Sequence, residues 1–146
     1  MRGLIQRVSS ASVSIDGHIV GAINQGLLLL LGVQHGDTQA QADKLLQKIV
    51  RYRVFADAED KMNLSVSDIA GGLLIVSQFT LAADTQKGLR PGFSSAAAPE
   101  LAKQRYDYFV EQAKAINTLS VATGVFAADM QVALVNDGPV TFLLES

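Results

Sequence analysis

Residues 2–33 have the sequence RGLIQRVSSASVSIDGHIVGAINQGLLLLLGV. Residues 2–8 alternate between two sets of side chains, which is the period of a β-strand, and Val13 and Ile15 continue the pattern. Asp16-Gly17 predicts a tight hairpin, because a type I′ turn needs positive φ at both central positions. Partner strands are predicted over residues 19–23 and, after a turn at 24–26, over residues 27–33, whose apolar run is typical of a strand buried on both faces.

The period changes to that of an amphipathic helix after this segment. Asp37 or Thr38 can cap the helix start by accepting backbone N–H bonds. A second helix is predicted from Pro99, because proline suits the first helical turn. The predicted apolar faces are Ala42, Leu45, Leu46, Ile49 and Val50 in the first helix, and Leu101, Phe109, Val110, Ala113 and Ile116 in the second.

The remaining apolar segments alternate with turn signals and one long connection over residues 82–98. A structureless connection of that length is uncommon unless it is functional. The sum is about eight strands and two main helices, which predicts a single α/β domain over residues 1–146 with mixed or mostly antiparallel sheets, not a Rossmann-like fold. The further strands are predicted at residues 53–55, 73–78, 119–122, 130–135 and 140–144, with a turn at 136–139.

The composition excludes several kinds of catalytic group and metal site. The chain has 146 residues, a formal net charge of −2, no Cys and two His. Without Cys there is no disulfide, thiolate zinc site or Cys nucleophile, and two His cannot form a His₃ metal site. We therefore expect no metal site and no cofactor. The apolar runs are far shorter than the roughly 20 residues of a membrane helix, and the N-terminus does not resemble a signal peptide, so a cytoplasmic protein is expected.

The segment Ser77-Gln78-Phe79-Thr80-Leu81 follows a predicted buried strand. Its hydroxyls, amide and backbone N–H groups could bind a developing oxyanion. A strand that simply ends in polar residues is the alternative, and it is the commoner case because no general base lies nearby in sequence.

Three other segments carry candidate binding groups. Asn136 to Thr141 is either an ordinary turn or a site with a cis Gly138-Pro139 bond, which is rare for X-Pro bonds. Phe126 and Met130 flank a Gly turn and could stack on a base, although core packing is the default for both. The candidate phosphate-binding cations are Lys87 and Arg90 in the long loop, and Lys44, Lys48 and Arg51 on the polar face of the first helix, where the alternatives are a solvated loop and a solvated helix face.

Taken together and in this order, these segments resemble the D-aminoacyl-tRNA deacylase family, also called D-tyrosyl-tRNA deacylases. The resemblance runs over the whole chain, and its most specific motifs are Ser77 to Leu81 and Asn136 to Thr141. Gly88-Leu89-Arg90-Pro91 and Phe126 to Met130 support it. Gly92 is a mild variation that affects only the local loop.

The resemblance implies a homodimer that hydrolyses the ester between a D-amino acid and the 3′-terminal adenosine of tRNA, and that also acts on glycyl-tRNA. It implies chiral proofreading in translation quality control. Gly138 and Pro139, joined by a cis bond, would cross into the partner subunit's site and exclude L side chains. Ser77, Gln78, Phe79 and Thr80 would be the catalytic residues, and Leu81, Phe126 and Met130 would contact the substrate.

Two mechanisms are compatible with this resemblance. Either the Thr80 hydroxyl attacks the ester, or the 2′-hydroxyl of the tRNA assists while backbone donors near Phe79 and Thr80 bind the oxyanion. We favour the second, because an alcohol is a weak nucleophile without an adjacent base. A non-catalytic module that binds RNA ends or nucleotides, and a purely structural dimer, are the rival functions.

Overall fold

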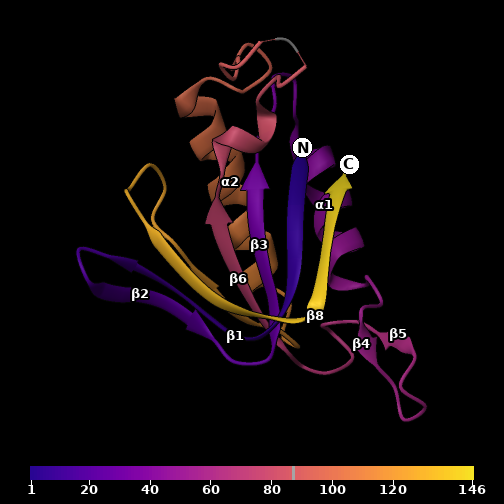
Figure 1. Cartoon of the computed structure of the whole chain (residues 1–146). Helices are drawn as coiled ribbons and strands as arrows, with labels where there is room; N and C mark the ends of the chain where they lie inside the picture. The colour runs from indigo at the N-terminus through magenta and orange to yellow at the C-terminus, as the bar shows by residue number, and fades with distance from the viewer. Residues whose placement is uncertain (87) are drawn as a thin grey trace.

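The computed structural model describes residues 1–86 and 88–146, so the predicted phosphate-binding residue Lys87 lies outside the described residues. The architecture confirms the predicted α/β class with a mixed sheet and two main helices (Figure 1). In chain order the elements are β1 (Arg2–Ile15), β2 (His18–Ile23), β3 (Gly26–Gly32), α1 (Gln39–Val50), β4 (Phe55–Ala56), β5 (Met62–Leu64), β6 (Gly72–Ser77), the 3₁₀ helix η1 (Phe79–Ala82), α2 (Pro99–Lys114), β7 (Ser120–Thr123) and β8 (Gln131–Glu145).

One main sheet is organised around the long strand β1. Its order is β2-β1-β3-β6-β7, and β8 pairs with β1 as well. The predicted hairpin is confirmed, since Asp16 and Gly17 have φ values of 50° and 78° and Ile15 pairs with His18. β1 pairs antiparallel with β3 and β8, whereas β3, β6 and β7 run parallel to one another. β4 and β5 form a separate two-stranded sheet.

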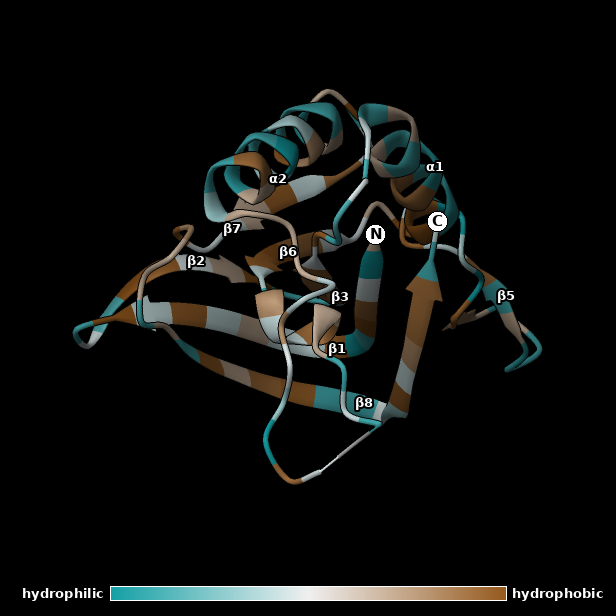
Figure 2. Ribbon diagram, turned by 90° about the horizontal axis from the view of Figure 1, so that it is seen from above, coloured by the Kyte–Doolittle hydropathy of each residue, from teal (hydrophilic) through white to brown (hydrophobic). Residues whose placement is uncertain are grey.

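Both helices cover the same face of the main sheet, because the crossovers from β3 to β6 and from β6 to β7 step in the same direction across it and such connections are right-handed. α1 lies on the path from β3 to β6 and α2 on the path from β6 to β7, and they lie side by side above the strands (Figure 2). The larger hydrophobic core fills the space between helices and sheet. A smaller core on the other face contains Val8, Ala11, Val13, Ile23, Leu28, Leu74 and Val76.

The predicted apolar face of α1 is confirmed, since all five residues are buried. Thr38 stands at the N-cap, and its backbone N–H donates to the Gln41 side-chain oxygen at 3.0 Å. Asp37, the alternative cap, instead accepts from the N-terminal ammonium of Met1 at 2.6 Å and from the Gln34 N–H at 2.7 Å. Sequence spacing cannot show the contact with Met1, because Met1 and Asp37 meet only through the fold.

The predicted face of α2 is wrong in part. Phe109 and Ala113 are buried, but Leu101 and Val110 are only partly buried, and Ile116 lies beyond the end of the helix. Val110 and Ile116 still pack against the larger core, and Ala102 and Tyr106, which the pattern does not predict, are buried in it. Tyr106 can be buried because its hydroxyl donates to the Ile75 carbonyl at 3.0 Å, which satisfies its polar end.

The predicted turn at residues 136–139 is also wrong. β8 runs through it from Gln131 to Glu145, and both halves pair with β1, with register shifts around Val8. Side-chain hydrogen bonds of Asn136 stand where the strand pairing is interrupted: its Oδ1 accepts from the Val140 N–H at 3.1 Å, and its Nδ2 donates to Thr141 Oγ1 at 3.0 Å. Turn-forming residues therefore produce an irregularity within one strand, and the Gly138-Pro139 bond is cis.

We expect the buried Tyr106 to lower the free energy of unfolding at alkaline pH. Burial, with a smaller effect of the Asp107 charge, raises the pKa of Tyr106 from 10.0 to about 12. The folded state then keeps a proton that the unfolded state releases, so this contribution is complete below pH 10 and is lost as pH rises toward 12. It is on the order of 3 kcal/mol, at about 1.4 kcal/mol per pKa unit. Denaturant unfolding of wild type and Tyr106→Phe between pH 9 and 12 measures it, and parallel pH dependences would contradict it.

Candidate active site

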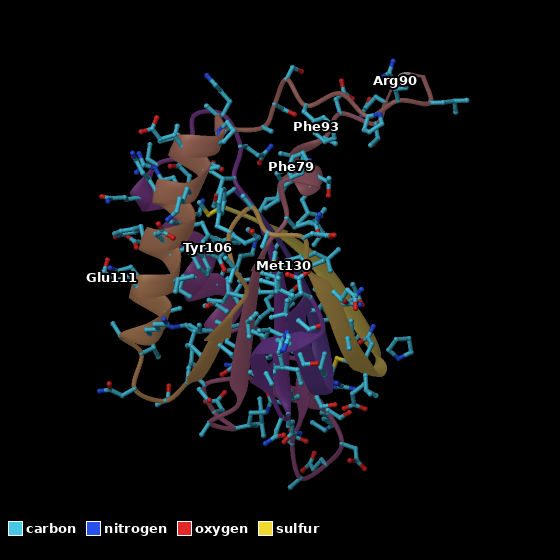
Figure 3. All side chains as sticks on the ribbon, turned by 90° about the vertical axis from the view of Figure 1, so that its left-hand side faces the viewer. Phe79, Arg90, Phe93, Tyr106, Glu111 and Met130 are labelled. Carbon is cyan, nitrogen blue, oxygen red and sulfur yellow. The ribbon has the colours of Figure 1, made fainter. Side chains whose placement is uncertain are left out.

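A groove of about 530 Å³ lies at the carboxyl end of β6. At this point β6 is followed by η1, and α2 begins nearby after the long loop. Its lining consists of Val76, Ser77 and Gln78 at the end of β6, Phe79 of η1, Pro99 and Ala102 of α2, Phe126, Ala127, Ala128, Asp129 and Met130 between β7 and β8, and Val132 of β8. Two motifs about fifty residues apart in sequence thus meet in one cleft, and in Figure 3 Phe79 and Met130 lie near each other at this end of the sheet.

Thr80 has an amide as its neighbour, not a base. The Gln78 side-chain amide donates to Thr80 Oγ1 at 2.5 Å. Among the described residues no carboxylate or imidazole is hydrogen-bonded to this hydroxyl, which is exposed. An amide N–H₂ group orients a hydroxyl but does not accept its proton. The geometry therefore holds the Thr80 oxygen as an acceptor and provides no activation for attack.

Backbone donors stand at the same point. The Gln78 N–H donates to the Leu31 carbonyl at 2.8 Å, which fixes the end of β6 against β3. The next two N–H groups, of Phe79 and Thr80, open η1 and have no acceptor inside that helix. Such N–H groups are suited to binding an oxyanion.

Phe126 and Met130 have both packing and lining roles. The Phe126 ring lies 5.7 Å from the Tyr106 ring, centroid to centroid, and packs against the larger core. Met130 packs against the smaller core. Both side chains are half-buried, so each leaves part of its surface in the groove.

Several predicted site residues lie elsewhere. Leu81 is outside the groove lining: its side chain lies against Gly32 of β3, and its carbonyl accepts from Arg2 Nη1 at 3.0 Å. Lys44 and Lys48 are exposed on α1, and Arg51 is exposed at its C-cap. This helix contributes nothing to the lining, and Lys48 donates to the Glu145 carbonyl at 3.1 Å. Arg90 is exposed in the long loop.

Gly138 and Pro139 do not reach the groove of their own chain. They lie opposite Gln6 to Val8 of β1, and on β8 they are at least six residues from Val132, the residue of that strand that lines the groove. Arg7 supports this segment, since its Nε donates to the Asp137 carbonyl at 3.0 Å and its Nη1 to the Val54 carbonyl at 2.6 Å. These contacts cover most of the Arg7 side chain, which is therefore unavailable as part of a basic surface.

The sequence pattern does not predict seven of the lining residues as site residues: Val76, Pro99, Ala102, Ala127, Ala128, Asp129 and Val132. The sequence pattern predicts Pro99 only as a helix start and gives Ala102 no role, because their place in the groove depends on how α2 packs. Asp129 lies inside the motif from Phe126 to Met130 but has no predicted role of its own. It is exposed and is the one charged side chain among the described lining residues.

Comparison with known proteins agrees with this architecture. The sequence model of the family described as D-Tyr-tRNA(Tyr) deacylase matches residues 4–145. The chain is 63% identical over 145 residues to a D-aminoacyl-tRNA deacylase of Cellvibrio japonicus, covering 99% of each chain. It is 64% identical over 144 residues to the protein of that name from Pseudoalteromonas translucida, again with 99% of each chain covered.

Solved structures give the same result for the fold. A structure named as a c-Myc DNA Unwinding Element Binding Protein has a TM-score of 0.93 and 40% sequence identity, covering 100% of this chain and 99% of the other. A second, described as a probable eukaryotic D-amino acid tRNA deacylase, has a TM-score of 0.82 at 15% identity, covering 99% and 98%.

The fold, the cleft and these relatives define the class as a deacylase, which is a hydrolase of ester bonds. The chain belongs to the D-Tyr-tRNA(Tyr) deacylase family. No helix in the described part of the chain is long and apolar enough to span a membrane.

Proposed function

We propose that this protein hydrolyses the ester bond between a D-amino acid and the 3′-terminal adenosine of tRNA, and that it acts on glycyl-tRNA as well. It works as a chiral proofreading enzyme of the cytoplasm. The observation that carries the proposal is the groove, which is lined by Ser77, Gln78 and Phe79 at the end of β6 and by the apolar side chains of Phe126 and Met130. One side suits a reacting ester and the other suits a nucleoside.

In the proposed reaction the oxygen of a water molecule adds to the ester carbonyl carbon. The bond from that carbon to the ribose oxygen then breaks, and the ribose oxygen takes the proton. The backbone N–H groups of Phe79 and Thr80 bind the oxyanion, which is worth on the order of 10²–10³ in rate for each donor. The neighbouring 2′-hydroxyl of the tRNA assists the proton transfer, since Thr80 has no base beside it.

Thr80→Ala is expected to retain hydrolysis. Its hydroxyl is held by an amide, so removing it should change kcat/KM for D-tyrosyl-tRNA by no more than about tenfold, whereas loss of a covalent nucleophile costs on the order of 10⁶. Single-turnover release of D-tyrosine measures the effect, and Thr80→Ser is the matched control. A loss of more than about a thousandfold in Thr80→Ala that Thr80→Ser restores would assign the attack to Thr80.

Chiral selection is proposed to come from a second copy of the chain. Gly138 and Pro139 are exposed and distant from the groove of their own chain, while β8 carries exposed apolar side chains at Val135, Phe142 and Leu143. In a homodimer built on this strand, the Gly-Pro segment would enter the partner's site and leave no room for an L side chain. The enzyme would then discriminate by excluding one enantiomer.

The tRNA phosphates are proposed to contact Lys44, Lys48 and Arg51 of α1 and Lys87 and Arg90 of the long loop. Since the net charge is only −2, contacts limited to the acceptor end are compatible with a chain that is not broadly basic.

Nucleic-acid binding without catalysis is the second candidate, because a protein of the same fold at 40% identity is named for binding a DNA unwinding element. Incubation with D-tyrosyl-tRNA distinguishes the two. Release of free D-tyrosine above the buffer rate supports the hydrolase, and a stable complex with no release supports the binding module. Absence of both would favour a purely structural dimer.

A further inference from the structure

Two aromatic rings are exposed to solvent beside the groove. Phe79 is 61% exposed and Phe93 is 40% exposed. Their ring centroids are 5.0 Å apart and the planes are inclined by 47°. Phe79 lines the groove and Phe93 does not, so the pair extends the apolar surface of the groove outward. In Figure 3 Phe93 lies on the side of Phe79 away from Met130.

The backbone that presents Phe93 is fixed on both sides. Asp84 and Gly92 exchange two backbone hydrogen bonds of 2.8 and 3.0 Å. On the other side the Ser95 hydroxyl donates to the Ala82 carbonyl, and the Ser95 carbonyl accepts the His35 N–H at 2.9 Å. The ring therefore stands on an ordered part of the long loop, and its exposure is a property of the fold.

We propose that Phe93, supported by Phe79, is a stacking platform for the base of the nucleotide that precedes the terminal adenosine of tRNA. The inference rests on the proposed function, which puts that adenosine in the groove. A single strand leaving the groove past Phe79 meets Phe93 next. Aromatic faces bind unpaired bases by stacking and accept any base, as a site common to many tRNAs requires.

Charge agrees with this occupant. Arg90 is exposed on the same loop as Phe93 and lies further out along it (Figure 3). A strand that stacks on Phe93 carries its phosphates toward this guanidinium, which binds phosphate oxygens well. The exposed rings have two alternative roles: Phe93 only supports the backbone of Phe79, or a second copy of the chain covers both rings.

The experiment compares substrates that differ by the nucleotides in question. D-Tyrosyl-adenosine ends at the groove, whereas D-tyrosyl esters of the trinucleotide CCA continue past it. For Phe93→Ala, the ratio of kcat/KM on the trinucleotide ester to that on the adenosine ester is expected to fall by about 5- to 100-fold, the range of one lost stacking contact. Phe93→Trp should keep the ratio. The matched control is Leu89→Ala, on the same loop and fully exposed.

Each alternative has its own outcome. An equal loss on both esters would make Phe93 a support for Phe79, and an unchanged ratio with altered mass in light scattering would make the rings a protein interface. Either result overturns the platform. If the wild-type protein hydrolyses neither ester, the proposed function is refuted, but the platform can still be tested. Calorimetry then measures the binding of unacylated CCA and of adenosine. Here Phe93→Ala should weaken only CCA.

Discussion

D-Tyrosyl-tRNA ending in 2′-deoxyadenosine is expected to be hydrolysed about 10²–10⁴-fold more slowly than the normal substrate, the usual contribution of a positioned acid–base group. The reason is the surroundings of Thr80. Its hydroxyl accepts a hydrogen bond from Gln78, and among the described residues no base is bonded to it. If the protein lacks the group that moves the proton, the substrate has to supply it, and the 2′-hydroxyl is adjacent to the ester.

The control for this experiment is the uncatalysed reaction. The 2′-hydroxyl also affects spontaneous ester hydrolysis, so the quantity to compare is the acceleration over buffer for each substrate. Full acceleration on the deoxy substrate would refute assistance by the 2′-hydroxyl. The deoxy substrate and the Thr80→Ala variant together decide the mechanism. Assistance by the 2′-hydroxyl requires that the deoxy substrate loses acceleration and that Thr80→Ala keeps its activity.

The sequence predicts those elements whose pattern is local. The apolar face of α1 and the hairpin at Asp16-Gly17 follow from spacing and from the φ values that two residues must adopt. The face of α2 is mispredicted in part, because the apolar spacing does not identify Tyr106 as a core residue. Its burial depends on a hydrogen bond to the Ile75 carbonyl, on a strand 31 residues away.

The turn signal at Asn136 to Pro139 fails for a different reason. Its residues do have turn chemistry, but β1 is long enough to pair with the chain on both sides of them. The residues that favour a turn therefore form an irregularity within β8 and do not separate two strands. Nothing in the four residues distinguishes these outcomes, because the difference lies in the pairing partner.

For the candidate site, the sequence identifies Ser77 to Thr80 and Phe126 with Met130 as separate segments. Their meeting in one groove is a consequence of β6 and β7 being parallel neighbours, so that the chain leaves both strands at the same edge. Pro99 and Ala102 are missed because neither carries a polar side chain, and their place in the groove depends on how α2 packs. Composition indicates an enzyme that does not use Cys or His as catalytic groups. The Gln78–Thr80 contact agrees with this, because the group bonded to the Thr80 hydroxyl is an amide and not a base.

Gly138→Ala is expected to lower kcat/KM for D-tyrosyl-tRNA at least about 10²-fold, the effect of displacing a positioned group by about 1 Å. Gly138 has φ of +131°, and an added Cβ would lie 2.7 Å from Val140 Cγ2 and 3.0 Å from Arg7 Nη2. The side chains of Val140 and Arg7, or the segment itself, must shift. Gly17→Ala is the matched control, since φ is +78° there and no atom lies within 4 Å of the added Cβ.

Both variants are expected to lose about 1–3 kcal/mol of stability through backbone strain, but only Gly138→Ala should lose activity. Thermal unfolding and kinetics on the same preparations separate the two effects. Full activity and full D-selectivity in a folded Gly138→Ala protein would contradict the gate.

Subunit mixing decides whether the gate acts on its own chain or on the partner. Ala128→Phe would fill the groove of one chain, since Ala128 lines it, and would leave Gly138 intact. Combined with Gly138→Ala chains, it forms heterodimers in which one site has an open groove from one chain and a normal Gly-Pro segment from the other. A gate that crosses the dimer restores about a quarter of wild-type activity in an equal mixture, because half of the dimers are mixed and each has one working site. A gate that acts within one chain restores none, because every open groove then belongs to a chain with the altered segment.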